Sequence, residues 1–128
     1  MDIVITPKKL IGSVTVIPSK SQAHRILICS AFADNATEII CPETNRDIEA
    51  TVCCLNALGA TIERTTDGYK VLPIRRKPHN AVLNCGESGS TLRFLLPIVG
   101  ALQADAVFRW TKTDRSCRSL QILHSKKL

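Results

Sequence analysis

Aromatic residues and long apolar runs are both scarce in this chain of 128 residues. Phe, Trp and Tyr make up 4% of it, so few rings can stack on bases, which argues against a reader of single-stranded nucleic acid. No apolar run reaches the roughly 18 residues that a membrane-spanning helix needs, so we expect no membrane partner. Because no secretory signal precedes the first strand-like segment, we expect a cytoplasmic location.

The six cysteines form no CxxC pair, and no histidine stands at zinc-finger spacing. Neither His24 nor His79 has an obvious ligand or triad partner in the sequence. Most of the cysteines lie within apolar runs, where a free cysteine behaves as a small hydrophobic residue. We therefore predict no metal site, no disulfide scaffold and a reducing compartment. The six are Cys29, Cys41, Cys53, Cys54, Cys85 and Cys117.

The net charge of +6 is unevenly distributed along the chain. Residues 1–108 hold 11 Lys and Arg against 10 Asp and Glu, whereas residues 109–128 hold 6 against 1. The basic character thus belongs mostly to the tail. One candidate function follows, a small basic binding module that uses residues 109–128 to contact nucleic acid or an acidic surface. A salt-dependent DNA shift that is lost on deleting this tail would support it.

Alternating and helical apolar patterns predict a regular order of strands and helices. The expected elements are strands 2–6 and 11–17, a helix from about 19 to 33, a strand 36–41, a helix Arg46–Leu58 ended by Gly59, hairpin strands 60–64 and 69–74, a strand from 81, a helix 90–102 and a strand 104–110. The first helix is expected to bury Ala23, Ile26, Leu27, Ser30 and Ala31, and the second Ile48, Val52, Leu55 and either Cys53 or Cys54. This order predicts an α/β (α+β) fold with one full βαβαββ repeat and an incomplete second copy.

The stretch Leu83–Phe94, LNCGESGSTLRF, predicts a strand, a tight glycine turn and a helix N-terminus. Unpaired backbone N–H groups and the helix dipole attract anions at such a place, and glycine lets a ligand approach the backbone closely. Ser88, Ser90 and Thr91 can cap the helix or donate to an oxyanion. Arg93 supplies a full positive charge. The alternative is an ordinary helix cap after a glycine turn, since no lysine follows the last glycine as in a P-loop.

A second informative stretch, PSKSQAHR, spans residues 18–25. Ser19 or Ser21 is expected to cap the helix that follows. Lys20 stands at the corner between strand and helix, and Arg25 lies about one turn later. A lysine beside a helix N-terminus is unfavourable unless an anion fills the site, so these cations favour anion binding. The alternative is a solvated lysine and a surface arginine.

These motifs, in this order and spacing, resemble the 5-enolpyruvylshikimate-3-phosphate synthase (3-phosphoshikimate 1-carboxyvinyltransferase) family over roughly residues 3 to 108. The matching features are IGSVTVIPSKSQAHR at Ile11–Arg25, the NRDIEAT helix start, LGA followed by a hairpin, and LNCGESGSTLRFL. Glu87 stands where the family turn usually has Asn. The related transferase that acts on UDP-N-acetylglucosamine typically has Lys-Asn where this chain has Lys20 and Ser21.

The resemblance implies transfer of the enolpyruvyl group from phosphoenolpyruvate to shikimate 3-phosphate, with release of phosphate, in chorismate and aromatic amino acid biosynthesis. It implies no metal and no organic cofactor, and a fold of two globes, each of three βαβαββ repeats. It also implies site residues: Lys20 is catalytic and touches both substrates, Ser21 and Arg25 hold shikimate 3-phosphate, Gly89 and Ser90 bind phosphoenolpyruvate where glyphosate competes, and Arg93 supports them.

The same resemblance divides the chain. It implies that residues 1–18 are strands that join the other globe, 19–79 the first repeat, 80–108 the start of the second, and 109–128 a basic tail that does not match. The family chain is several times longer and usually monomeric. We therefore expect a truncated form that lacks turnover alone and that could self-associate.

Overall fold

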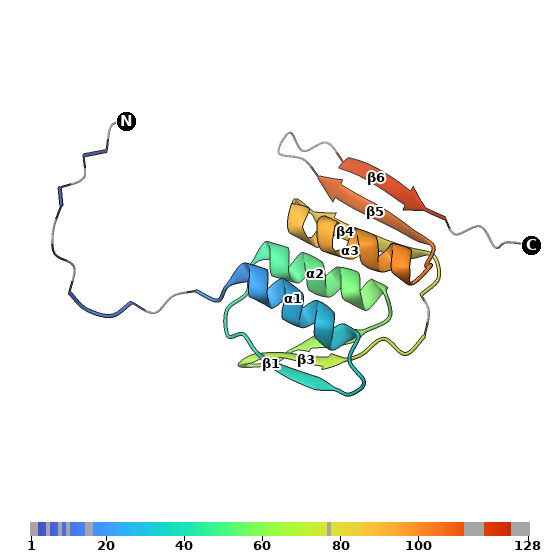
Figure 1. Cartoon of the computed structure of the whole chain (residues 1–128), viewed down its shortest axis with the longest axis horizontal. Coiled ribbons are helices and arrows are strands. Elements are labelled where there is room, and N and C mark those ends of the chain that lie inside the picture. Colours follow the sequence, from blue (N-terminus) through green and yellow to red (C-terminus); the bar gives the residue numbers. More distant parts are fainter. Residues whose placement is uncertain are drawn as a thin grey trace, which may run out of the picture.

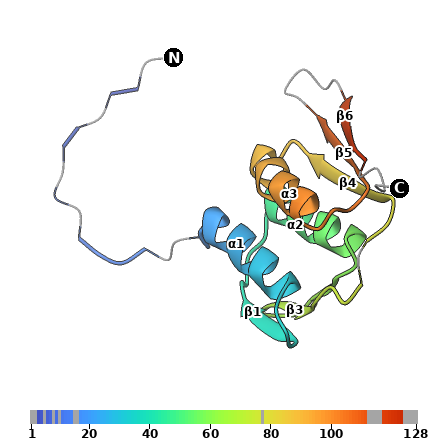
Figure 2. The same cartoon turned by 45° about the vertical axis from the view of Figure 1, so that its right-hand side comes forward.

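The computed structural model describes residues 3–4, 6–7, 9, 11–14, 17–76, 78–111 and 117–123. Three helices lie between two three-stranded sheets (Figures 1 and 2). The helices are α1 (Lys20–Ala31), α2 (Arg46–Ala57) and α3 (Gly89–Ala101), and none of the described helices is long and apolar enough to cross a membrane. The predicted mixed α/β fold is confirmed.

The two sheets differ in how their strands pair. The first is antiparallel in the order β1 (Thr37–Ile40), β3 (Gly68–Leu72), β2 (Thr61–Arg64). In the second, β4 (Ala81–Gly86) and β5 (Ala106–Thr111) are parallel and joined across α3, and β6 (Cys117–Ile122) runs antiparallel to β5. The parallel pair needs the helical crossover that α3 provides. Strand β6 was not predicted, because the tail was recognised only by its charge.

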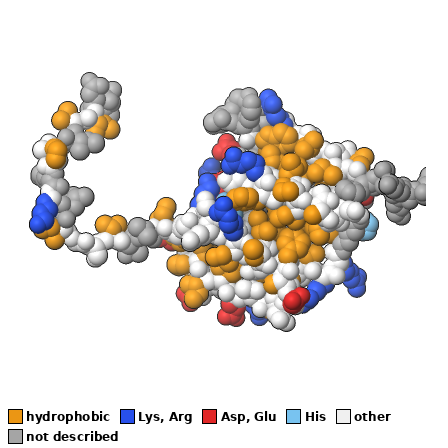
Figure 3. Space-filling view, in the orientation of Figure 1, with side chains coloured by type: hydrophobic (Ala, Val, Ile, Leu, Met, Phe, Trp, Pro, Cys, Tyr) orange, Lys and Arg blue, Asp and Glu red, His pale blue; other side chains and the backbone are white. Residues whose placement is uncertain are grey.

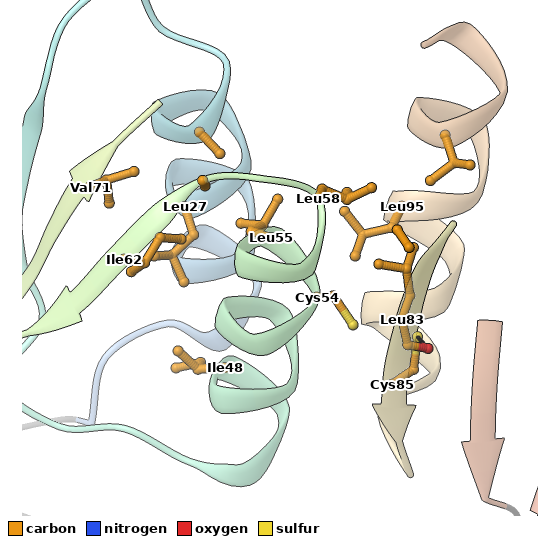
Figure 4. Close-up of a cluster of buried hydrophobic side chains, with 14 of the residues drawn as sticks. Leu27, Ile48, Cys54, Leu55, Leu58, Ile62, Val71, Leu83, Cys85 and Leu95 are labelled. Carbon is orange, nitrogen blue, oxygen red and sulfur yellow. Dashed lines mark hydrogen bonds between the residues drawn. The ribbon is translucent and has the colours of Figure 1, made fainter. Parts of the chain in front are cut away.

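Helix α2 is central to the core because it packs against both sheets (Figure 4). On one side it meets α1 and the first sheet, and on the other side β4 and α3. Each fully buried Leu or Val contributes roughly 1.5–3 kcal/mol relative to an exposed one. The labelled side chains on the first side are Leu27, Ile48, Leu55, Ile62 and Val71, and those on the second are Leu83, Cys85 and Leu95, all of them buried.

Two of the three helix starts follow local capping rules. The Asn45 side chain accepts hydrogen bonds from the backbone N–H groups of Asp47 and Ile48, each at 3.0 Å, and caps α2. The Ser88 hydroxyl accepts from the backbone N–H of Thr91 at 3.2 Å and caps α3. The predicted serine cap of α1 is wrong, because Ser19 occupies the cap position without a side-chain hydrogen bond.

The two predicted N-terminal strands are wrong wherever the structure describes them. Residues 3–4, 6–7, 9, 11–14 and 17 belong to no strand, and their apolar side chains are 76–89% exposed. The other residues of those strands lie outside the described ones. Alternating β-branched residues make a strand only when a neighbouring strand accepts their hydrogen bonds. The described part of the first repeat is therefore αβαββ.

The predicted helix faces are confirmed with two exceptions. Ile26 is 47% exposed, and Val52 is only partly buried against the core. On α2 the structure resolves the open choice, since Cys54 is buried and Cys53 is exposed. The remaining predicted boundaries agree with the structure to within two residues.

Candidate functional site

An open cleft of about 680 Å³ lies where the starts of α1 and α2 meet the end of β4. The first residue of α1, the capped first turn of α2 and the turn after β4 form its walls. The turn is possible because Gly86 adopts a φ of +54° and its backbone N–H donates to the Asn84 side chain at 3.2 Å. The lining residues are Lys20, Asn45, Arg46, Asp47, Ala50, Cys85, Gly86 and Glu87.

Lys20 forms an ion pair with Asp47 across the two helix starts. The lysine side chain is 48% exposed and the aspartate side chain 25% exposed, so solvent screens the pair and its net worth is below about 1 kcal/mol. Asp47 also lies in the first turn of α2, where a carboxylate complements the helix dipole. In the sequence Asp47 is recognisable only as part of the NRDIEAT helix start, so its pairing with Lys20 was missed.

The two sequence motifs are brought together through their helices. The guanidinium of Arg25 on α1 lies 5.2 Å from the ring centroid of Phe94 on α3, a cation–π contact. The same guanidinium donates to the backbone carbonyl of Ser21 at 3.0 Å. Lys and Arg side chains gather beside the starts of α1 and α3 (Figure 3).

Of the predicted site residues, Lys20 lines the cleft directly. Ser21 follows it on α1, and Gly89 begins α3 three residues after Gly86. Gly89 and Arg93 are exposed and Ser90 is half-buried, but these three, like Ser21 and Arg25, are not among the residues that line the cleft. The additional lining residues lie in two of the recognised motifs, four of them in the NRDIEAT helix start and three in the glycine turn of LNCGESGSTLRF.

A buried chain of hydrogen bonds joins all three helices behind the cleft. The His24 Nδ1 atom lies 2.7 Å from the Thr51 hydroxyl, which lies 2.8 Å from the Thr91 hydroxyl. Thr91 in turn bonds the Ser88 hydroxyl at 2.7 Å and donates to the Asp47 carbonyl at 3.3 Å. The sequence showed no sign of this hydrogen bond, because the partner of His24 lies 27 residues away. We call this set of hydrogen-bonded side chains the three-helix polar junction.

His24 is held neutral by its surroundings. Burial lowers the pKa of its imidazole, and the nearby positive charges of Lys20 and Arg25 lower the pKa further. Its Nε2 atom is buried and has no hydrogen-bond partner among the described residues. The tilted ring of Phe94 lies with its centroid 6.1 Å from that of the imidazole. The junction therefore carries hydrogen bonds but no charge.

Comparisons with known proteins agree on one family. Residues 4–110 match the family model described as EPSP synthase (3-phosphoshikimate 1-carboxyvinyltransferase). The 3-phosphoshikimate 1-carboxyvinyltransferase of Clostridium beijerinckii is 42% identical over an alignment of 103 residues, and the match covers 73% of this chain and 23% of that protein. The enzyme of the same name from Clostridioides difficile is 38% identical over an alignment of 117 residues, and the match covers 83% of this chain and 26% of that protein.

The fold has solved counterparts as well. The structure of EPSP synthase from Acinetobacter baumannii superposes with a TM-score of 0.64 at 25% identity, covering 77% of this chain and 23% of that chain. The present chain therefore spans about a quarter of the length of the relatives it matches. These similarities give no support to the alternative of a small basic binding module.

Proposed function

This chain belongs to the EPSP synthase family, and from that premise we propose that its cleft binds the anionic substrates of enolpyruvyl transfer. The reaction moves the carboxyvinyl group of phosphoenolpyruvate to shikimate 3-phosphate and releases phosphate. Both substrates are polyanions, so the site that binds them needs fixed positive charge and free N–H donors. The chain supplies both at the starts of its helices.

The cleft is the observation that carries the proposal. It unites the Lys20 ammonium with the first turn of α2 and with the glycine turn that precedes α3. Each helix start adds partial positive charge to that of the lysine. We infer that a substrate phosphate or carboxylate takes the position that the Asp47 carboxylate holds beside Lys20.

Individual roles follow the family motifs. We assign the catalytic role to Lys20, which would contact both substrates and pass a proton. Ser21 and Arg25 would hold shikimate 3-phosphate. Gly89 and Ser90 would bind phosphoenolpyruvate through the first turn of α3, and their N–H groups would face its anionic groups. Arg93 would support them with positive charge.

The chain alone is proposed to bind but not to turn over. It spans 23–26% of the relatives above, so most of the groups that close a full-length active site lie outside it. A phosphate-release assay with both substrates tests this point. Turnover at the rate of a full-length enzyme would show the inactivity proposal to be wrong, without bearing on which residues bind.

Calorimetric titration with shikimate 3-phosphate tests the cleft itself. Lys20→Met should weaken binding at least about tenfold, the effect of losing about 1.4 kcal/mol, because a charge-assisted contact is lost. The matched control is Lys70→Met, which removes an exposed lysine on β3 that does not line the cleft and should leave affinity unchanged. Asp47→Asn should strengthen binding several-fold at low salt, because it removes the internal competitor for Lys20. Equal affinity for the Lys20→Met and unmodified chains would refute the proposal.

A further inference from the structure

Two buried thiols face each other across the centre of the molecule. Cys54 projects from α2 toward β4, where Cys85 is the last buried residue before the Gly86 turn (Figure 4). Both side chains are fully buried, and 31 positions separate them in the sequence. All six cysteines are free thiols in this structure. Neither Cys54 nor Cys85 has a part in the proposed reaction.

The two thiols influence each other and differ in acidity. The hydrogen bond with Cys85 and burial raise the pKa of the Cys54 thiol. The same hydrogen bond lowers the pKa of Cys85, although burial opposes it. Of the two thiols, Cys85 therefore loses its proton more readily than Cys54. A thiolate is the nucleophilic form of cysteine, so Cys85 is the reactive member.

Although the side chain of Cys85 is buried, Cys85 is one of the residues that line the cleft, whereas Cys54 is a core residue that does not line it. A small uncharged oxidant such as hydrogen peroxide can enter a cleft of about 680 Å³. The neighbour Cys53 is exposed on the other side of α2, and successive residues of a helix do not face the same partner.

We propose that Cys54 and Cys85 are an oxidant-sensitive pair that closes to a reversible disulfide between α2 and β4 when the chain meets a peroxide. The inference goes beyond the proposed function and depends on the packing of α2 on β4. The two side chains lie opposite each other between α2 and β4 (Figure 4), and a disulfide brings their sulfurs to the bonding distance of about 2.05 Å.

The chemistry takes two balanced steps. The Cys85 thiolate attacks one peroxide oxygen, so that an S–O bond forms, the O–O bond breaks and hydroxide leaves. The Cys54 sulfur then attacks the Cys85 sulfenic acid, the S–S bond forms, and the hydroxyl leaves as water with the Cys54 proton. In total two thiols are oxidised and one peroxide is reduced to two waters, counting the proton that Cys85 had released to solvent.

The experiment maps the bond in the full 128-residue chain. Trypsin places Cys53 and Cys54 in one peptide, so the chain carries Cys53→Ser, an exposed position, to make Cys54 the sole thiol of that peptide. The chain is treated with dilute hydrogen peroxide, blocked with N-ethylmaleimide, and digested with and without dithiothreitol. We expect a linked Cys54–Cys85 peptide in the digest made without dithiothreitol, and we expect it to be absent from the digest made with dithiothreitol.

A second variant identifies which thiol reacts first. Cys54→Ser leaves Cys85 without a resolving partner, so a sulfenic acid should accumulate at Cys85 and be trapped by dimedone. Cys29→Ser removes an exposed thiol and should leave the linked peptide unchanged. Oxidation confined to the exposed cysteines, with both Cys54 and Cys85 recovered as maleimide adducts, would overturn the proposal. The mapping with Cys53→Ser alters neither buried thiol, so it does not depend on how Cys54→Ser folds.

Discussion

Thr51→Val tests the three-helix polar junction most directly. Valine has nearly the shape of threonine, so the change removes the hydroxyl from a fully buried position and leaves no cavity. Thr91 keeps the Ser88 hydroxyl and the Asp47 carbonyl as partners. His24 loses its Nδ1 partner at 2.7 Å, and its Nε2 atom is already without one among the described residues. The stability lost in Thr51→Val should therefore come mainly from the His24 imidazole, which is left buried without a hydrogen-bond partner in the described part of the chain.

The expected loss can be estimated from that geometry. Leaving a buried polar group unsatisfied costs roughly 1–3 kcal/mol, and the added methyl group recovers up to about 0.8 kcal/mol. We expect a net loss of about 1–2 kcal/mol, which is a factor of roughly 5–30 in the folding equilibrium. The measurement is urea unfolding followed by circular dichroism. The dependence of the unfolding free energy on urea concentration is compared between the variant and the unmodified chain, because an equal slope shows that the unfolded state is unchanged.

Two control variants separate the hydroxyl from the methyl group. Thr51→Ser keeps the hydrogen bonds and loses one methyl group, so it should cost about 1 kcal/mol through lost packing. Thr61→Val, at an exposed position of β2, should change stability by less than about 0.5 kcal/mol. A Thr51→Val chain as stable as the unmodified one would refute the reasoning, because the hydroxyl would then be dispensable.

Further predictions concern the pH dependence of stability and the room for a side chain at two glycines. Because the pKa of His24 is lowered from its ordinary 6.5, the unfolded chain binds a proton first as pH falls, so the stability that this group contributes is present above pH 6.5 and is lost below it. Below pH 6.5 the free energy of unfolding should fall by up to about 1.4 kcal/mol per pH unit. Urea midpoints measured over that pH range should lose this dependence in His24→Gln. They should keep it in the control His79→Gln, which changes an exposed site. Gly68→Ala should cost about 3 kcal/mol or more in thermal unfolding, because a Cβ there would lie 1.7 Å from the Ile39 carbonyl oxygen and part β1 from β3. Gly100→Ala, with nothing within 4 Å of its Cβ position on α3, should instead stabilise by about 0.5–1 kcal/mol, and a loss comparable to that of Gly68→Ala would contradict the steric argument.

Most of the described fold could be predicted because its signals are local. The caps at Asn45 and Ser88 bond backbone N–H groups two or three residues away, and sequence shows such spacing directly. The glycine after α2 adopts a φ of +102°, which ends the helix where the sequence predicted. The prediction of two N-terminal strands was wrong because an alternating pattern specifies which side chains share a face, but not the neighbouring strand with which the segment must pair.

The candidate site was only partly predictable for a related reason. Lys20 and the turn after β4 were recognisable from their motifs, since charge and glycine before a helix have a local meaning. The ion pair between Lys20 and Asp47 and the junction between His24 and Thr51 both cross 27 positions in sequence. Such pairings depend on how α1 packs on α2, which residue types alone do not specify.

Helix α2 serves the cores of both sheets. It stands between β1 and β2 of the first sheet in sequence, yet one of its sides closes the core over β4 of the second sheet. A chain cut after residue 79 would leave that side of α2 facing water, and the remaining piece would lose the packing of α2 on β4. The two sheets are thus not autonomous folding units, so both should melt in a single cooperative transition.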